Sequence, residues 1–181
     1  MLLKRIGYIP DEIDAPDIDE FINHGEKPGP YVIRMARSKA EIVSRRHKNS
    51  YIIAADTVIF SGAKIHGKAS NKEEALKILK QLSGKKHKVY GGICIISPNK
   101  NIALKTIITQ VSFRIINQEE IYDYLLNDEW KDKAGGYAIQ GIASKFVKRI
   151  NGSYTNVVGL CVYTVESVLG NIKEANNVEH K

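Results

Sequence analysis

Asp56 is the residue best suited to chemistry, because it interrupts the otherwise apolar stretch of residues 52–59. Burying a carboxylate among Ile, Val and Ala side chains is costly unless it is paired, binds a metal or lies at a strand end that faces a cleft. Asp56 is therefore a candidate catalytic or metal-binding residue. The alternative interpretation is an aspartate at a strand end that caps a neighbouring turn.

The acidic run Asp17-Ile18-Asp19-Glu20 is a second candidate. It gathers carboxylate oxygens, the ligands that Mg²⁺ prefers, within one predicted loop. It lacks the spacing and the glycine of an EF-hand loop, so the alternative is a solvated acidic segment. Lys68 follows Gly67 at a predicted turn, where its ammonium group could bind a phosphate as a point charge.

Two predicted elements and one loop would position these residues. Residues 31–47 predict a helix because their apolar side chains recur on one face. Residues 51–60 are rich in Ile and Val and predict a buried strand with a polar end at Asp56. Residues 15–30 are rich in Asp, Gly and Pro and predict a loop, which would carry the acidic run.

The remaining segments predict further strands and helices around a central sheet. Asn71 with Glu74, and Asn117 with Glu120, have the spacing of helix-capping boxes. Because strands and helices alternate, the sequence predicts an α/β or mixed α+β fold. The predicted strands are residues 8–14, 87–97, 102–114 and 144–150, and the predicted helices are residues 71–83, 117–127 and 161–171, with a frayed polar tail from residue 174.

The composition bounds the class of protein. The chain has 181 residues, 43% hydrophobic and 26% charged, which suggests one globular domain or two lobes that share a core. A net charge of +7 is compatible with nucleic-acid binding, an anionic small ligand or simply a solvated basic face. The densest basic runs are short and contain no aromatic residues, so nucleic acid is the least favoured of the three.

Several classes of protein and site are disfavoured. No apolar stretch is long enough to span a bilayer, and no apolar run of a secretory signal follows Met1. We therefore expect a soluble, cytoplasmic protein with no membrane partner. Cys94 and Cys161 form no C-x-x-C pair, so we expect buried free thiols and neither a zinc site nor dithiol chemistry.

Eight segments together resemble the successive motifs of the Maf family of nucleoside triphosphate pyrophosphatases. They follow the family's order and spacing, and the resemblance extends from Leu2 to about Leu169. The segments are Asp17-Ile18-Asp19-Glu20, Arg37-Ser38-Lys39-Ala40, Ala55-Asp56-Thr57-Val58, Gly67-Lys68, Leu82-Ser83-Gly84 with His87 and Val89, Asp132-Lys133-Ala134-Gly135, Tyr137-Ala138-Ile139-Gln140-Gly141, and residues 152–160.

The resemblance implies a fold and a reaction. The implied fold is an elongated, two-lobed α/β structure with a mixed twisted sheet, flanking helices and a central cleft. It would be a single Maf-like domain over residues 1–172, followed by a polar tail over residues 173–181. The implied reaction is hydrolysis of a nucleoside triphosphate to the monophosphate and pyrophosphate with a divalent cation, Mg²⁺ or Mn²⁺. Family members are linked to nucleotide-pool cleaning and to arrest of cell division, and a homodimer is left open.

The resemblance also implies roles for individual residues. Asp56 matches the family's proton acceptor, and Glu20 matches the acidic residue that binds metal or orients water; both are candidate metal ligands. Lys39 and Lys68 match lysines that hold phosphate oxygens, although the residue pattern alone also fits an exposed helix charge at position 39. The remaining matches are Thr57 and Gln140, which resemble the branch that prefers dTTP and UTP.

The sequence also departs from the family pattern. Maf proteins open with a short apolar strand and a Ser-x-Ser-Pro-Arg-Arg loop, whereas residues 1–7 align with the helix after that loop. We expect an N-terminally truncated form, and the alternative function is an inactive Maf-like protein that binds nucleotide or a division partner. Gly91 stands where the family commonly has threonine. Other departures are Ala69, Trp130 and Cys161.

Overall fold

A computed structural model describes residues 2–178, and the chain divides into two compact units. Unit 1 consists of Met1–Asp56, Gly92–Thr106 and Leu160–Lys181, and unit 2 consists of Thr57–Gly91 and Ile107–Gly159. Three strands cross the boundaries between these segments, so both units contain parts of the same strands.

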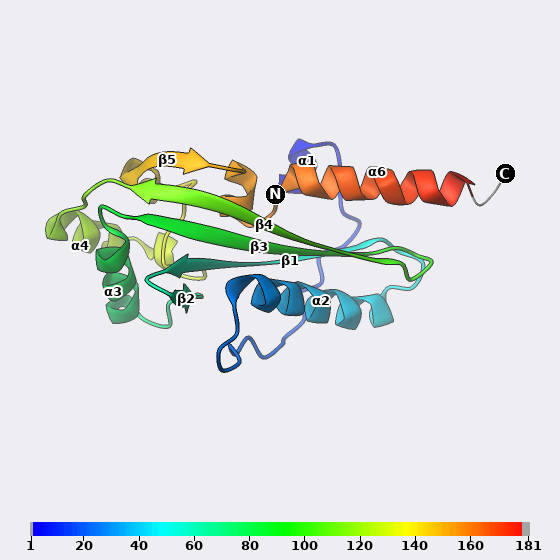
Figure 1. The fold of residues 1–181 in the computed structure, drawn as a ribbon, viewed down its shortest axis with the longest axis horizontal. Helices are drawn as coiled ribbons and strands as arrows, with labels where there is room; N and C mark the ends of the chain where they lie inside the picture. Colours follow the sequence, from blue (N-terminus) through cyan, green and yellow to red (C-terminus); the bar gives the residue numbers. More distant parts are fainter. Residues whose placement is uncertain (1, 179–181) are drawn as a thin grey trace. The chain divides into compact units, whose positions relative to one another are not determined.

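One sheet has the strand order β2-β1-β3-β4-β5 (Figure 1). β1 pairs with β2, and β4 pairs with β5, in antiparallel register. The predicted α/β class with a central sheet and flanking helices is confirmed. The strands are β1 (Ile52–Ser61), β2 (Lys64–His66), β3 (Lys86–Ile96), β4 (Ile102–Phe113) and β5 (Val147–Asn151).

Unit 1 is organised around α2 (Pro28–Arg46), the helix predicted over residues 31–47. It begins earlier than predicted because proline fits the first turn of a helix, where its missing N–H leaves no bond unmade. Ala36, Ala40 and Val43 form the buried stripe, which packs with residues of β1 and β3, including Cys94. The same unit contains the short α1 (Leu2–Arg5) and the C-terminal α6 (Val162–Val178).

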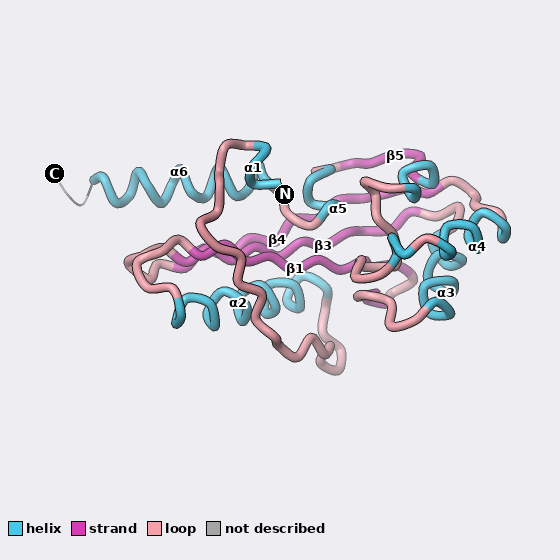
Figure 2. Tube along the Cα trace, turned by 180° about the vertical axis from the view of Figure 1, so that it is seen from behind, coloured by secondary structure: helices cyan, strands magenta, loops and turns pink. Residues whose placement is uncertain are grey.

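Residues 8–14 form no strand, which corrects the prediction for this segment. Pro10 has no N–H to donate to a sheet, and Asp14 is instead bound by side chains from the end of α2. Arg46 contacts Asp14 at 2.9 Å, and His47 contacts it at 3.1 Å. The segment therefore belongs to the long loop that joins α1 to α2 (Figure 2).

Unit 2 has its own core beneath two capped helices, α3 (Lys72–Leu82) and α4 (Gln118–Leu126). Both were predicted. The side chain of Asn71 accepts from Glu74 N, and Asn117 with Glu120 forms a complete capping box. The core also takes side chains from the short helical segments η1 (Asp128–Trp130), η2 (Ile142–Phe146) and α5 (Tyr154–Val158).

Two strands of unit 2 differ from the predictions. β2 was not predicted; it completes a hairpin whose two-residue turn, Gly62-Ala63, has φ values of 57° and 60°, as the commonest hairpin turns require. β5 begins at Val147 and not at residue 144, because η2 occupies the preceding residues.

Two buried polar side chains in unit 2, His87 and Asn156, form hydrogen bonds within that unit. His87 Nε2 lies 2.8 Å from the hydroxyl of Tyr137. Asn156 donates to Val89 O at 3.3 Å and to Thr109 Oγ1 at 3.1 Å. A methyl group at Gly91 would collide with Asn156 Oδ1, so the missing side chain at position 91 provides the space that the amide fills.

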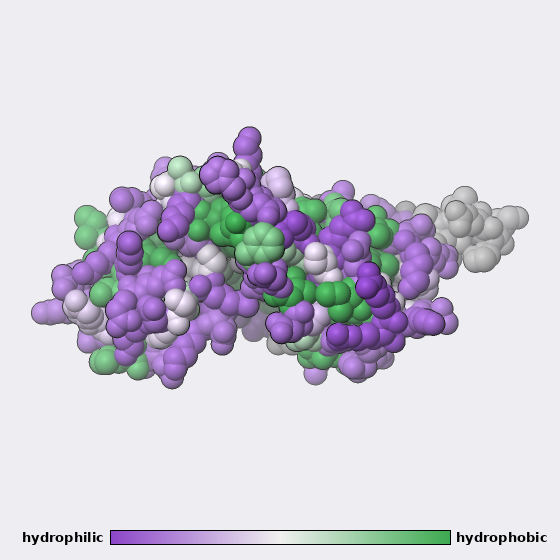
Figure 3. Space-filling view, turned by 90° about the horizontal axis from the view of Figure 1, so that it is seen from below, coloured by the Kyte–Doolittle hydropathy of each residue, from purple (hydrophilic) through white to green (hydrophobic). Residues whose placement is uncertain are grey.

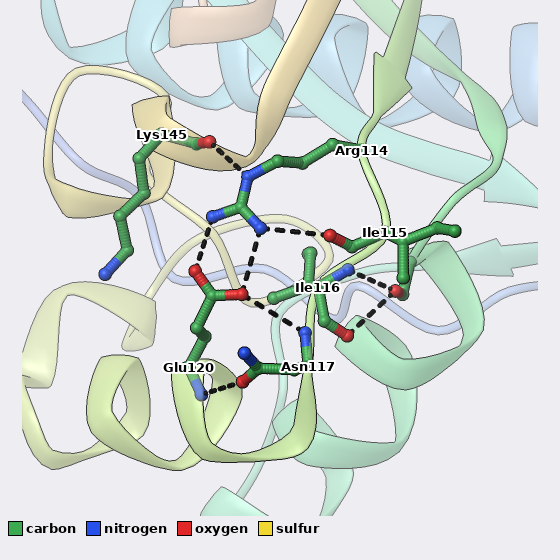
Figure 4. A network of polar contacts seen from close by, with 7 residues as sticks. Arg114, Ile115, Ile116, Asn117, Glu120 and Lys145 are labelled. Atoms are coloured by element: carbon green, nitrogen blue, oxygen red, sulfur yellow. Dashed lines mark hydrogen bonds and ion pairs between the residues drawn. The ribbon is translucent and has the colours of Figure 1, made fainter.

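Arg114 ties the end of β4 to α4 and to η2 (Figure 4). Its guanidinium group donates two hydrogen bonds to the carboxylate of Glu120, at 2.9 and 2.5 Å. It also donates to Lys145 O at 2.9 Å. The hydrogen bonds from Arg114 lower the pKa of Glu120 to about 2, so this carboxylate stays ionised. One side chain therefore joins the end of β4 to the helix that follows it and to η2, whose Lys145 is 31 positions further along the chain.

At the C-terminal end, α6 continues to Val178, past the predicted end at residue 171. It takes in residues 174–178, which were predicted as part of a frayed tail; residues 179–181 lie outside the described part of the chain. Among the described residues, no helix has both the length and the apolar character needed to cross a membrane. Figure 3 shows hydrophobic side chains scattered among hydrophilic ones on one face.

Candidate active site

Lys39 joins the two predicted acidic residues within unit 1. Its Nζ lies 2.6 Å from Asp56 Oδ1 and 2.7 Å from Glu20 Oε1. The three residues come from α2, β1 and the α1–α2 loop, so the fold brings together groups that are far apart in the sequence. The alternative of an exposed helix charge at position 39 is wrong, because the Lys39 side chain is largely buried against these two carboxylates.

The environment keeps this cluster charged. The Asp56 side chain is 10% exposed and the Lys39 side chain is 19% exposed, so water screens the pair only in part. Burial by itself would lower the pKa of Lys39, but the hydrogen bonds that Lys39 donates to Asp56 and Glu20 raise this pKa overall. One ammonium group thus contacts two carboxylates.

Tyr31 fixes the loop next to Glu20. Its hydroxyl donates to the backbone oxygen of Glu20 at 2.9 Å. Burial, followed by the negative charges of Asp56 and Glu20, raises the pKa of Tyr31 to about 12. The hydroxyl therefore remains protonated, and remains a donor, across the physiological pH range.

Glu20 and Asp56 fit a magnesium ion that is shared with a substrate. Among the described residues, no group of three or more His, Cys, Asp or Glu side chains is placed to hold a metal. Mg²⁺ usually binds proteins through one or two carboxylates and completes its shell with substrate phosphates and water. Two carboxylates on one cluster meet that requirement, whereas a dedicated protein cage for a metal would need more ligands.

Unit 2 carries the other predicted site residues. Lys68 is exposed and forms an isolated bridge with Ala134, and next to it Gly135 N donates to Gly67 O at 2.7 Å. The segment around Lys68 is thus held against the glycine-rich loop. Gln140 is also exposed, and Thr57 is half-buried in β1 directly after Asp56.

Sequence reasoning missed Tyr31 and Arg34, which lie one turn apart on α2. Arg34 Nη2 donates to Phe21 O at 2.9 Å, while Tyr31 donates to the preceding carbonyl oxygen. The spacing of three residues along the helix was the available signal, since residues at i and i+3 lie on one face. It could not identify their partners, because these are backbone carbonyl groups of a loop.

Known proteins are similar to this chain over almost its whole length. The family described as Maf-like protein matches residues 1–172. A dTTP/UTP pyrophosphatase of Rhodospirillum rubrum is 42% identical over 93% of this chain and 80% of its own length. A dTTP/UTP pyrophosphatase of Paramagnetospirillum magneticum is 41% identical over 93% and 88%, respectively. A nucleoside triphosphate pyrophosphatase of Ehrlichia chaffeensis is 38% identical over the same two shares.

Proposed function

The chain belongs to the Maf family, and from that premise we propose that it is a nucleoside triphosphate pyrophosphatase that cleaves dTTP and UTP with a divalent cation. The observation that carries the proposal is the cluster in which Lys39 bridges Glu20 and Asp56. It combines a candidate base, a second carboxylate and a candidate phosphate-binding cation within one partly buried group, which is what cleavage of a triphosphate requires.

In the proposed reaction, Asp56 takes a proton from the attacking water. The water oxygen bonds to the α-phosphorus, the bond to the bridging oxygen breaks, and that oxygen leaves with pyrophosphate. The products are a nucleoside monophosphate and pyrophosphate. The carboxylate of Asp56 is suited to the task because it sits in the regular strand β1 and is held by Lys39 at 2.6 Å.

Glu20 and Asp56 would hold the cation, Mg²⁺ or Mn²⁺, which when bound supplies positive charge to the phosphates and acidifies water. The ammonium of Lys39 is the protein's own positive charge at the same place. When a triphosphate arrives, we expect Lys39 to turn from the carboxylates to phosphate oxygens, since both are anions within its reach. We also propose that Lys68 binds phosphate oxygens.

We assign base recognition to Thr57 and Gln140. A glutamine amide both donates and accepts hydrogen bonds, which suits the edge of a pyrimidine base. We also propose that the reaction takes place in the cytoplasm, with a role in nucleotide-pool cleaning and a link to arrest of cell division. The names of two relatives, both dTTP/UTP pyrophosphatases, support the pyrimidine assignment. The nucleotide-pool and cell-division roles rest on the family resemblance alone.

Pyrophosphate release from dTTP, measured with Mg²⁺, with Mn²⁺ and with excess chelator, tests the proposed function. We expect turnover with either cation and none with chelator. Binding of dTTP without pyrophosphate release would contradict the proposal and support a nucleotide-binding protein. Turnover that persists in chelator would contradict the assignment of Glu20 and Asp56 to a cation.

A further inference from the structure

The loop around Glu20 is tied to α2 by two hydrogen bonds to successive backbone carbonyls. Tyr31 donates its hydroxyl to Glu20 O, and Arg34 donates Nη2 to Phe21 O, each at 2.9 Å. Both donors come from the first two turns of the helix that also carries Lys39. The backbone of the loop is thus fixed relative to Lys39 on either side of the peptide bond that joins Glu20 to Phe21.

Arg34 is itself held in place. Its Nε and Nη2 atoms contact the carboxylate of Glu26 at 2.8 and 2.6 Å, a bidentate pair. Glu26 also accepts from Asn23 N at 3.0 Å, and its side chain is only 9% exposed. The guanidinium group lies over the rings of Phe21 and Tyr31, 5.4 Å from each centroid. An arginine with this many partners has little freedom to move with the loop.

These contacts determine where the Glu20 carboxylate points. Fixing the backbone at Glu20 fixes the direction of its Cα–Cβ bond, and the side chain then ends 2.7 Å from Lys39 Nζ. We propose that Tyr31 and Arg34 are positioning residues, which hold Glu20 at the cluster with Lys39 and Asp56 so that it can serve a divalent cation. This inference rests on the proposed function, since the cation is part of it.

A loop of this length would otherwise sample many positions. The segment between α1 and α2 has no regular secondary structure in the described residues, so its order depends on side-chain contacts. A mobile Glu20 would meet Lys39 and a cation for only part of the time. The apparent affinity for the cation falls by the fraction of time that the competent position is occupied.

The test uses Tyr31→Phe, which removes only the hydroxyl, and Arg34→Gln, which removes the charge and the bidentate pair. The matched control is Tyr163→Phe, which removes a hydroxyl from a tyrosine that is 79% exposed. The first readout is amide hydrogen exchange over residues 19–23 in the absence of nucleotide and cation. We expect exchange to be about threefold to tenfold faster in both variants, as the loss of one hydrogen bond implies, and unchanged in the control.

The second readout is Mn²⁺ binding followed by electron paramagnetic resonance, together with the Mn²⁺ dependence of dTTP cleavage. We expect the dissociation constant for Mn²⁺ to rise about fivefold in Tyr31→Phe, with the KM for dTTP at saturating Mn²⁺ unchanged. A purely structural role for Tyr31 would instead lower the amount of folded protein without this selective change.

Unchanged exchange over residues 19–23, or unchanged Mn²⁺ binding in both variants, would overturn the inference. If the wild-type protein does not release pyrophosphate, the proposed function fails. Exchange and Mn²⁺ binding still decide whether Tyr31 and Arg34 position Glu20, because neither measurement needs turnover.

Discussion

Lys39 Nζ lies 2.6 Å from Asp56 Oδ1, and this ion pair links residues 17 positions apart in the sequence. The same Nζ reaches Glu20 at 2.7 Å, so a single ammonium lies between two carboxylates that are both assigned to a divalent cation. The proposed cation would therefore compete with the lysine for the same oxygens when no nucleotide is bound.

The variant Asp56→Asn should lose most of the activity and keep the fold intact. The asparagine amide has nearly the same shape as the carboxylate but cannot accept the proton, and loss of a general base typically costs about 10²- to 10⁴-fold in rate. Pyrophosphate release from dTTP measures the effect, with circular dichroism as the check on folding. Near-normal turnover in this variant would remove Asp56 from the mechanism.

The variant Lys39→Met should bind Mn²⁺ more tightly than the wild type when nucleotide is absent. Methionine has a similar length but no charge, so it cannot compete with the cation for Glu20 and Asp56. We expect the dissociation constant to fall about fivefold or more, because an opposite charge next to a carboxylate is worth about one pKa unit or more. Turnover should fall at the same time, since phosphate oxygens lose a cation.

Lys48→Met is the matched control, because it removes the same charge from an exposed position in the same unit. Equally tighter Mn²⁺ binding in both variants would show that the change in affinity comes from the net charge of the protein and not from competition at Glu20 and Asp56. Weaker binding in Lys39→Met would show that Lys39 supports the cation site and does not compete with it.

The variant Gln140→Ala should narrow the preference for pyrimidine nucleotides. Loss of a hydrogen bond to the base edge should reduce the ratio of kcat/KM values for dTTP and dATP by about tenfold. The measurement is a panel of dTTP, UTP, dATP, dGTP and 7-methyl-GTP with both proteins. Wild-type preference for a purine nucleotide would contradict the assignment of this chain to the pyrimidine branch.

His87 should make the protein less stable below neutral pH. Burial, followed by the charge of His66, lowers the pKa of His87 from 6.5 to about 4. Between these values the unfolded chain binds a proton that the folded chain does not, so stability falls as the pH falls from 6.5 towards 4. The expected loss from this group is about 2 kcal/mol between about pH 7.5 and about pH 5.

Denaturant unfolding of His87→Gln at these two pH values measures that loss by difference. The variant should be less stable at the higher pH, because the contact with Tyr137 changes, but its stability should depend less on pH than that of the wild type. His24→Gln, at an exposed position, is the control for removal of a histidine. Equal pH dependence in the wild type and in His87→Gln would refute the prediction.

Local patterns predicted most of the regular structure, because the signals for it are local. The apolar face of α2, the apolar run at the end of β3 and the caps at Asn71 and Asn117 each lie within or next to a single element. The strand predicted for residues 8–14 was wrong because a tertiary contact, between Arg46 and Asp14, helps to determine the backbone conformation of this segment. β2 was not predicted because three residues are too few to show the alternation of apolar and polar residues that is typical of a strand. The hairpin turn and the pairing with β1 stabilise this strand.

The sequence identified candidate residues of the site but not the contacts between them. Glu20, Lys39 and Asp56 stand out because charged groups in such motifs are chemically informative, and the fold brings these three together. Nothing in the residue types of Tyr31 and Arg34 indicates that they bind carbonyl groups of Glu20 and Phe21. Every residue has a backbone carbonyl, so the sequence gives no sign of which carbonyl a side chain will bind. This part of the site could be identified only from the structure.

The close approach of Gly91 to Asn156 couples the effects of substitutions at these two positions. A side chain at position 91 would collide with the amide of Asn156 in its present place, so the amide would have to shift to accommodate threonine. Replacing Asn156 first, by a smaller residue, would abandon its bonds to Val89 and Thr109 but open the space. The two substitutions are therefore expected to be non-additive.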